Sequence, residues 1–425
     1  MIKQKYLNMA RKEINEIFMK DEKVTDDVYR IAPVWPVAGN GTLIVTGEGL
    51  VVVDTGIPAE GVDRVRRIRE KTDLPFHTII FTHGHGDHAG GVWAFLDDAK
   101  KRGDPEPRII GHELLPARLD KYKMLAGRRQ YIGRLQFPGR PVIGNNTDKP
   151  APAGYIYPTT LYSDSMKFTL GGLTFELYHG KGETDDATWV WVPERRLAVV
   201  GDLLIGGCPN TGNPLKEQRY TLEWSQALEK IAGKNPQYVV TAADPVLEGD
   251  LAQEVLLDTS RYLKLIQDQV VQLLNQEFWI DDIIKKVKIP EDLAKKPWLT
   301  PNYGHPVFII HDVYRRYTGW YDGNPSELFP ADKADIGREV INLAGGVGNL
   351  MARARKMKEQ GQSQLALHII DFAIQGSNNS PILKEALTLK SEILDARANI
   401  EPSLIARHIL KTGAAIAKES AERVK

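Results

Sequence analysis

The chain has 425 residues, more than one domain usually contains, and its 55 basic residues balance 55 acidic residues. Without a charge surplus or a polybasic block, nucleic acid is not an expected partner, and no apolar run is long enough to span a membrane. The N-terminus has no signal-peptide pattern and the single cysteine, Cys208, excludes an intramolecular disulfide, so we expect a cytoplasmic protein. From its length we expect two domains.

The first 23 residues have the pattern of a short amphipathic helix. Strand-like and helix-like segments then alternate as far as residue 250, and helical spacing of apolar residues dominates after it. This pattern predicts one domain over residues 1–250 and a helical domain over residues 251–425. The expected strands are 28–32, 41–45, 49–54, 78–82, 108–111, 167–170, 173–179, 188–192, 197–201 and 238–241.

The densest group of metal-binding residue types follows the expected strand 78–82. The run HGHGDH, from His83 to His88, contains three imidazoles and one carboxylate in six positions. Imidazole nitrogens and carboxylate oxygens are ligands of Zn²⁺, and the glycines allow neighbouring side chains to converge on one point. A single histidine on a strand is usually a packed core residue, but this density on a turn predicts a metal site.

This HxHxDH run, followed by Gly90 and Gly91, resembles the signature of the metallo-β-lactamase superfamily. The resemblance implies an α/β fold, the αββα sandwich. It also implies two metal ions, with His83 and His85 on the first ion, and Asp87 and His88 on the second. Asp54, after an apolar strand, would then support the ligands from behind; capping a turn is its alternative role.

Later carboxylates complete the ligand set that the resemblance implies. Glu183 stands where many members have a third histidine, which is typical of the alkylsulfatase-like branch, and is assigned to the first metal; an ordinary loop carboxylate is the alternative. Asp202 follows an apolar strand, where a carboxylate bridges the two ions. Ala243 replaces the final histidine, so Asp244 is the candidate ligand of the second metal. We expect two Zn²⁺ ions, with Mn²⁺ or Fe²⁺ as alternatives because oxygen ligands favour harder ions.

The second half carries a further resemblance. The run YRRYTGWYDGNP, from Tyr314 to Pro325, is similar to the linker that enters the dimerisation domain of alkylsulfatases. Segments 366–374 and 383–396 have apolar residues at helical spacing, so an all-α domain is expected. Because broad apolar faces need to be covered, we expect a homodimer through the C-terminal helices; packing on the chain's own catalytic domain is the alternative. The sequence ends before the lipid-transfer-like domain that family members often add.

The resemblance implies a metal-dependent hydrolase in which a metal-bound hydroxide attacks a small ester-type substrate. Sulfate ester, carboxylic ester, lactone and thioester all remain open. Phe308 and its neighbours replace the Ser-His-Asn segment of alkylsulfatases, and Pro214 falls near an expected arginine, although Lys216 and Arg219 are close in sequence. The residues that recognise sulfate in alkylsulfatases therefore have no clear counterparts in this sequence.

Residues with a candidate role in orienting substrate or moving protons are Asp87, His179, Tyr131 and His305. Packing or solvation is an equal alternative for the last three. Segment 104–154 is expected to lie over the mouth of the site. Two other functions also remain open: a mononuclear iron dioxygenase of the same superfamily, because the final histidine is missing, and a noncatalytic scaffold with a decayed second metal site.

Overall fold

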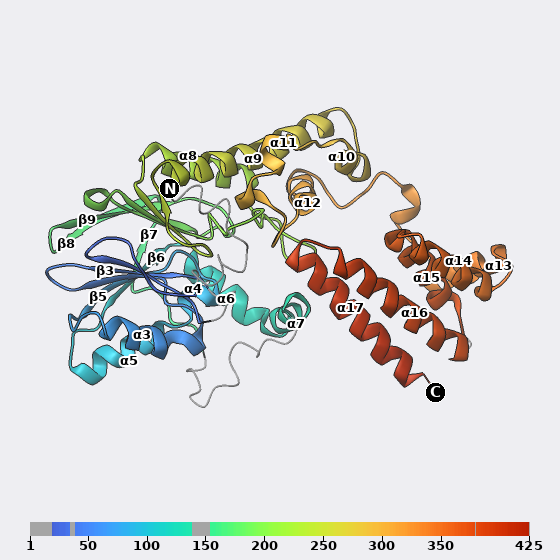
Figure 1. Ribbon diagram of the computed structural model, residues 1–425, viewed down its shortest axis with the longest axis horizontal. Helices are drawn as coiled ribbons and strands as arrows, with labels where there is room; N and C mark the ends of the chain where they lie inside the picture. The colour runs from blue at the N-terminus through green and yellow to red at the C-terminus, as the bar shows by residue number, and fades with distance from the viewer. Residues whose placement is uncertain (1–18, 35–38, 138–153, 379, 425) are drawn as a thin grey trace.

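The computed structural model describes residues 19–34, 39–137, 154–378 and 380–424. Figure 1 shows two stacked sheets with helices on both sides, and a group of C-terminal helices projecting from them. Most of the predicted N-terminal helix lies outside the described residues. In the part of the chain that is described, no helix is long and apolar enough to cross a membrane.

The first sheet contains strands in sequence order from β1 to β7. Neighbours from β1 to β4 are antiparallel, whereas those from β4 to β7 are parallel and need crossover connections, which helices α3 to α7 provide. The elements are β1 (Glu22–Lys23), β2 (Val28–Ile31), β3 (Gly41–Val45), β4 (Leu50–Val53), α3 (Gly61–Arg69), β5 (Phe76–Ile80), α4 (Gly86–Ala89), α5 (Val92–Arg102), β6 (Arg108–His112), α6 (Leu115–Met124), α7 (Ala126–Gln136) and β7 (Thr160–Tyr162).

The second sheet has the order β13-β12-β11-β10-β9-β8. Its neighbours are antiparallel except β11 and β12, which are parallel and are joined by helix α8. The elements are β8 (Ser165–Leu170), β9 (Leu173–His179), β10 (Thr188–Val192), β11 (Leu197–Gly201), α8 (Thr221–Gly233), β12 (Tyr238–Thr241) and β13 (Leu247–Glu248).

Three apolar layers hold this sandwich together. Ile80 of the first sheet and Leu177 of the second belong to the layer between the sheets. Phe95 of α5 belongs to the layer that covers the outer face of the first sheet. Trp224 of α8 and Leu263 of the next helix, α9 (Gly249–Asn275), cover the outer face of the second sheet. The order of layers is α, β, β, α, which confirms the predicted fold.

The remaining helices divide between two apolar cores. Those from α9 to α12 share the core outside the second sheet, to which Ile309 belongs. Those from α14 onward bury their own core, which includes Ile370 and Ile393. The division at residue 250 stays a prediction, and the first of these cores extends beyond it. The helices are α10 (Ile280–Lys286), α11 (Glu291–Ala294), α12 (Pro306–Tyr317), α13 (Lys333–Leu343), α14 (Val347–Glu359), α15 (Ser363–Gly376), α16 (Ser380–Asn399) and α17 (Leu404–Arg423).

Candidate metal centre

The loops that follow β4, β5, β9 and β11 meet at one edge of the sandwich. Parallel strands direct their carboxyl ends to the same edge, so the residues after β4 and β5 become neighbours. The second sheet joins this edge through a hydrogen bond of 2.7 Å from the amide of Thr188 to the carbonyl of Thr82. Four loops that are distant in sequence therefore contribute side chains to one place.

Asp202 lies at the centre of the cluster. Its Oδ2 is 3.3 Å from His83 Nε2, and its Oδ1 is 3.1 Å from His88 Nε2. These three residues form one group whose ligand atoms all lie within 4.8 Å of one another, and His85, Glu183 and Asp202 form a second such group. Because Asp202 belongs to both groups, its carboxylate has the position that a bridge between two cations needs.

Asp54 fixes the ring of His88. Its Oδ2 accepts a hydrogen bond from His88 Nδ1 at 2.6 Å, and its two oxygens accept bonds from the amide and hydroxyl of Thr82 at 2.8 and 2.7 Å. Asp54 has a φ of 62°, a left-handed conformation that aspartate tolerates better than most residues. Gly39 leaves room for the ring, since a Cβ there would lie 2.6 Å from His88 Cε1. Asp54 thus has the supporting position that the resemblance implied.

The donor atoms fit a divalent cation. With Nδ1 donating to Asp54, His88 Nε2 carries a lone pair, and this buried nitrogen has no hydrogen-bond partner among the described residues. It faces a carboxylate oxygen of Asp202, which also carries lone pairs. Buried electron-pair donors at this distance repel each other unless a cation or a proton lies between them. Imidazole and carboxylate together are a donor set that suits Zn²⁺.

The pKa values of two residues in the cluster reflect the close approach of its charged groups. Burial opposes the charged form of His88, but Asp202, Asp54 and Asp87 outweigh burial and raise the pKa of this imidazole well above its ordinary value. Burial raises the pKa of Glu183 to about 8, and Asp202 adds to this rise while Arg219 opposes it. His88 and Glu183 therefore favour their protonated forms at neutral pH, and a divalent cation competes with these protons for the same donor atoms.

Glu183 is held by residues of the long loop between β11 and α8. Arg219 forms an ion pair with its carboxylate, and Asn210 Nδ2 donates to Glu183 Oε1 at 3.0 Å. Asp312 on α12 fixes this loop by accepting the amide of Arg219 at 2.5 Å and the hydroxyl of Thr221 at 3.0 Å. The sequence drew attention to Arg219, but no motif indicated Asn210 or Asp312.

The loop after β9 is also tied to the histidine loop. Asp186 accepts the amide of Gly84 at 2.8 Å and forms an ion pair with Arg118 of α6 at the same distance. On the same helix, the ring of Tyr122 stacks against that of His85, with centroids 6.2 Å apart. Helix α6, which belongs to the segment expected over the mouth of the site, therefore lies beside the cluster; residues 138–153 of that segment lie outside the description.

Two predicted ligands lie outside both groups. Asp87 Oδ2 is 3.8 Å from His88 Nε2, so Asp87 stays next to the cluster. The carboxylate of Asp244 faces Gly206, where a Cβ would lie 2.3 Å from Oδ1, and its charge acts on the buried guanidinium of Arg30. The assignment of both as ligands stays a prediction.

Three other predicted site residues have contacts elsewhere. His179 stacks on His112 with centroids 3.8 Å apart, and its Nε2 lies 2.7 Å from the carbonyl oxygen of Asp185. Tyr131 is 43% exposed on α7. His305 caps α12, where its Nδ1 accepts the amide of Val307 at 3.1 Å. Their catalytic roles stay predictions.

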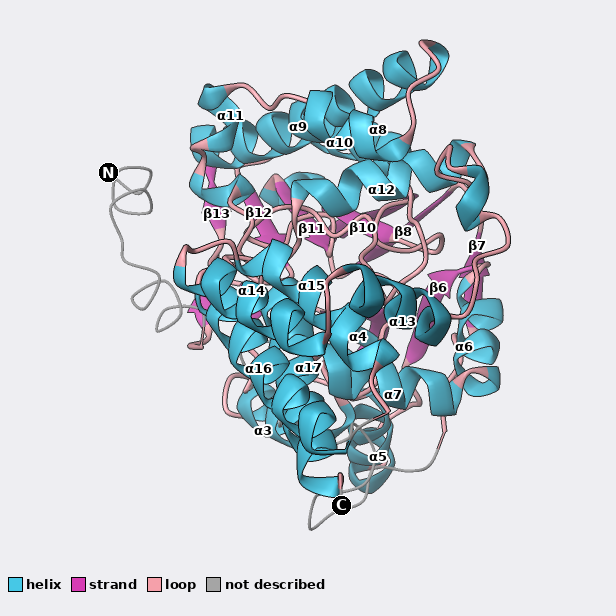
Figure 2. Cartoon of the chain, turned by 90° about the vertical axis from the view of Figure 1, so that its right-hand side faces the viewer, coloured by secondary structure: helices cyan, strands magenta, loops and turns pink. Residues whose placement is uncertain are grey.

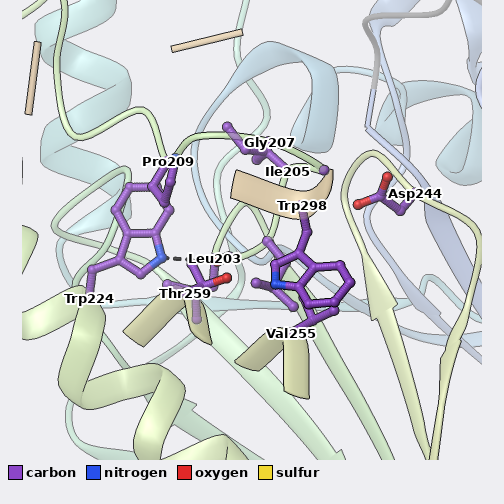
Figure 3. Close-up of a pocket in the computed structure, with 11 residues that line it drawn as sticks. Leu203, Ile205, Gly207, Pro209, Trp224, Asp244, Val255, Thr259 and Trp298 are labelled. Atoms are coloured by element: carbon purple, nitrogen blue, oxygen red, sulfur yellow. Dashed lines mark hydrogen bonds between the residues drawn. The ribbon is translucent and has the colours of Figure 1, made fainter. Parts of the chain in front are cut away.

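A small cavity lies beside the loop that follows Asp202 (Figure 3). Its volume of about 10 Å³ is enough for about one water molecule, not for a substrate. Two buried atoms of residues that line it, Thr259 Oγ1 and Trp298 Nε1, have no hydrogen-bond partner in the described part of the chain, so the cavity offers a water two polar contacts. Trp224 closes one side by donating to the carbonyl of Leu203 at 3.0 Å.

Residues 34–243 match the metallo-beta-lactamase superfamily, and residues 279–420 match the alkyl sulfatase dimerisation family. The chain thus combines a metallo-beta-lactamase domain with an alkylsulfatase-type dimerisation domain. The order of the two matches confirms the resemblance to the alkylsulfatase-like branch, because the sandwich and the C-terminal helices both have counterparts there.

Known relatives agree with this assignment. The chain is 26% identical over 362 residues to the linear primary-alkylsulfatase of Pseudomonas sp. (strain ATCC 19151), a match that covers 81% of this chain and 68% of that protein. It is 24% identical over 383 residues to the alkyl/aryl-sulfatase BDS1 of Saccharomyces cerevisiae, covering 85% of this chain and 59% of that one. The chain thus spans about three fifths to two thirds of these relatives' lengths.

A solved structure shows the same fold over nearly the whole chain. The stereoselective inverting sec-alkylsulfatase Pisa1 from Pseudomonas sp. matches 97% of this chain and 69% of its own, with a TM-score of 0.81 at 20% identity. At this identity the likeness concerns the fold alone.

Proposed function

We propose that this chain is a hydrolase that binds two divalent cations, Zn²⁺ by preference, and acts on ester-type substrates. The observation that carries the proposal is the approach of His88 Nε2 to a carboxylate oxygen of Asp202, two electron-pair donors that only a cation or a proton can hold together. His83, His85 and Glu183 would hold one cation and His88 the other, with Asp202 facing both. Distance supports this pairing, which the resemblance also implied: His83 Nε2 lies 2.8 Å from His85 Nδ1 and both face Asp202 Oδ2, whereas His88 Nε2 faces Oδ1.

Each residue of the centre has a separate task. A divalent cation at such a site lowers the pKa of water toward neutrality and polarises the bond to be broken. Asp54 keeps the lone pair of His88 Nε2 directed into the centre. The Arg219 guanidinium offsets the charge of Glu183, so that two buried carboxylates lie close together. Because Arg219 is paired with Glu183, the positive charge that attracts an anionic substrate would come from other residues.

A sulfate ester is the first substrate to test, because both named relatives are alkylsulfatases. Arg219 is occupied by Glu183, whereas Lys216 forms no ion pair among the described residues. Partial desolvation together with Arg219 and Arg129 lowers the pKa of the accessible Lys216 to about 8. A bound anion would therefore stabilise the charged form of this lysine. Phe308 offers no donor in place of the expected histidine, so carboxylic esters, lactones and thioesters belong in the same panel.

Metal analysis and a substrate panel test this proposal. Protein purified without added metal is expected to contain about two zinc or manganese ions per chain and to hydrolyse at least one ester class. His85→Ala and Asp202→Ala are expected to abolish turnover, whereas His368→Ala, on the exposed side of α15, serves as a matched control. Full activity in the first two variants contradicts the proposal, as does one iron per chain with oxygen uptake, or no metal at all.

We also propose that the chain forms a homodimer through the C-terminal helices. Large apolar side chains are exposed there, including Leu343 at 87% and Ile336 at 39%, and an apolar surface of this kind usually marks an interface. The match to the dimerisation family supports this proposal. Light scattering on purified protein is expected to give twice the chain mass, and Leu343→Asp to lower it; a wild-type monomer at micromolar concentration contradicts it.

A further inference from the structure

The turn before α12 packs directly on the loop that follows Asp202. Asn302 Nδ2 donates to the carbonyl of Gly206 at 3.0 Å. At Gly304, a Cβ would lie 3.0 Å from the carbonyl oxygen of Cys208, so the two backbones are in close contact. Tyr303 stands between these two anchoring residues. Its position is therefore fixed against the segment that links Asp202 to Asn210, the hydrogen-bond partner of Glu183.

The C-terminal helix holds Tyr303 from the other side. Ser403, which caps α17, donates its hydroxyl to the carbonyl of Tyr303 at 2.8 Å. Gln136, the buried last residue of α7, donates its side-chain amide to Tyr303 Oη at 3.2 Å. His408 of α17 contacts the carbonyl oxygen of Gln136 at 2.7 Å, which ties the two helices together. Figure 2 shows α17 running beside α7 in front of the sandwich.

This arrangement leaves the hydroxyl proton of Tyr303 available. Its oxygen already accepts the Gln136 amide, and among the described residues its O–H meets no acceptor. Burial raises the pKa of Tyr303 well above its ordinary value, and the charge of Glu183 adds to this rise, so the phenol keeps its proton at neutral pH. The charges of Asp87 and Asp202 act on it as well, as expected for a ring beside the cluster.

We propose that Tyr303 is a catalytic residue whose hydroxyl donates a hydrogen bond to the substrate oxygen that gains negative charge during ester hydrolysis, and that Gln136 and Ser403 position it. A donor that the fold holds in place stabilises a developing oxyanion without reorganisation when the reaction occurs. The C-terminal helix, part of the dimerisation match, thereby contributes to the active site. This inference rests on the proposed hydrolase function.

Tyr303→Phe tests the inference because it removes only the hydroxyl. We expect kcat to fall by about 100-fold with KM changed by less than about threefold, in line with the loss of one oxyanion donor. The affinity of the metal-loaded protein for inorganic phosphate, measured by calorimetry, should fall by about tenfold, since hydrogen bonds to charged groups contribute about 1.5–3 kcal/mol. Metal content should not change. Ser403→Ala should lower kcat by a smaller factor at constant KM.

Tyr317→Phe is the matched control. Tyr317 ends α12, and its Oη also accepts a glutamine side-chain amide, that of Gln267 at 2.9 Å, but it lies away from the cluster. Loss of the Tyr317 hydroxyl should leave kcat and phosphate affinity within about twofold of the wild-type values. Wild-type turnover and phosphate affinity in Tyr303→Phe overturn the inference. If the wild-type protein hydrolyses no ester, the proposed function fails and phosphate affinity alone decides the role of Tyr303; a wild-type protein that neither hydrolyses esters nor binds phosphate overturns both.

Discussion

Replacing Asp54 with asparagine should weaken metal binding without touching a proposed ligand. Asp54 Oδ1 accepts the amide of Thr82, and its Oδ2 accepts both the Thr82 hydroxyl and the proton on His88 Nδ1. An asparagine has only one acceptor oxygen. If that oxygen keeps the Thr82 amide, the asparagine NH₂ faces His88 Nδ1 and forces the imidazole proton onto Nε2, the atom that would bind the cation. The reverse orientation places two N–H donors against each other.

The magnitude follows from the role of such supporting residues. Loss of a group that orients a histidine ligand typically lowers metal affinity by 10- to 100-fold, which equals about 1.4–2.7 kcal/mol. Competition with a chromophoric zinc chelator measures this change directly. Asp27→Asn is the control, because Asp27 also accepts a threonine hydroxyl, that of Thr25, together with the Arg195 guanidinium, but contacts no proposed ligand and none of the residues that hold one. Equal affinity in Asp54→Asn and the wild-type protein would refute the reasoning.

Three other predictions concern single buried positions. Burial raises the pKa of Asp312 to about 7, so the stability that its protonated form contributes is complete below pH 4 and is lost as the pH rises through 7. In urea unfolding, the free energy of unfolding of Asp312→Asn should therefore rise relative to that of the wild type by up to about 4 kcal/mol between pH 4 and 8. A difference that stays constant with pH contradicts this. Burial raises the pKa of Cys208 to about 12, so a thiol reagent should label it only in unfolded protein, and rapid labelling of native protein contradicts this. Gly39→Ala places a Cβ 2.6 Å from His88 Cε1 and should lower zinc affinity, whereas Gly47→Ala, with no atom within 4 Å, should not; equal affinities would show that the ring has room to move.

The sequence predicted long, regular elements well because their patterns are local. Strands 41–45, 173–179, 188–192, 197–201 and 238–241 end at the predicted residues. The short strands β1, β7 and β13 were missed, because two or three residues do not establish an alternating pattern. The helices that share a core with the second sheet beyond residue 250 have the same periodicity as those of the C-terminal group, so periodicity alone does not show on which surface a helix packs.

The site shows the same contrast. The histidine run, Glu183 and Asp202 follow strands or lie in motifs, and the structure brings them together. The side chains that hold these ligands depend on how the loops fold in space, so the sequence did not indicate that Asn210 lies beside Glu183. Tyr303 was missed for a similar reason, since its position depends on packing against loops and helices that are far away in sequence.

The ligand role of Asp202 is the central claim, because this carboxylate is the member that both groups share. The most direct test is the metal content of Asp202→Asn, measured by mass spectrometry beside the wild type and a variant that removes one proposed ligand, His85→Ala. Asp202→Asn should lose both ions while remaining folded, and His85→Ala should lose only one. Wild-type metal content in Asp202→Asn would contradict the account.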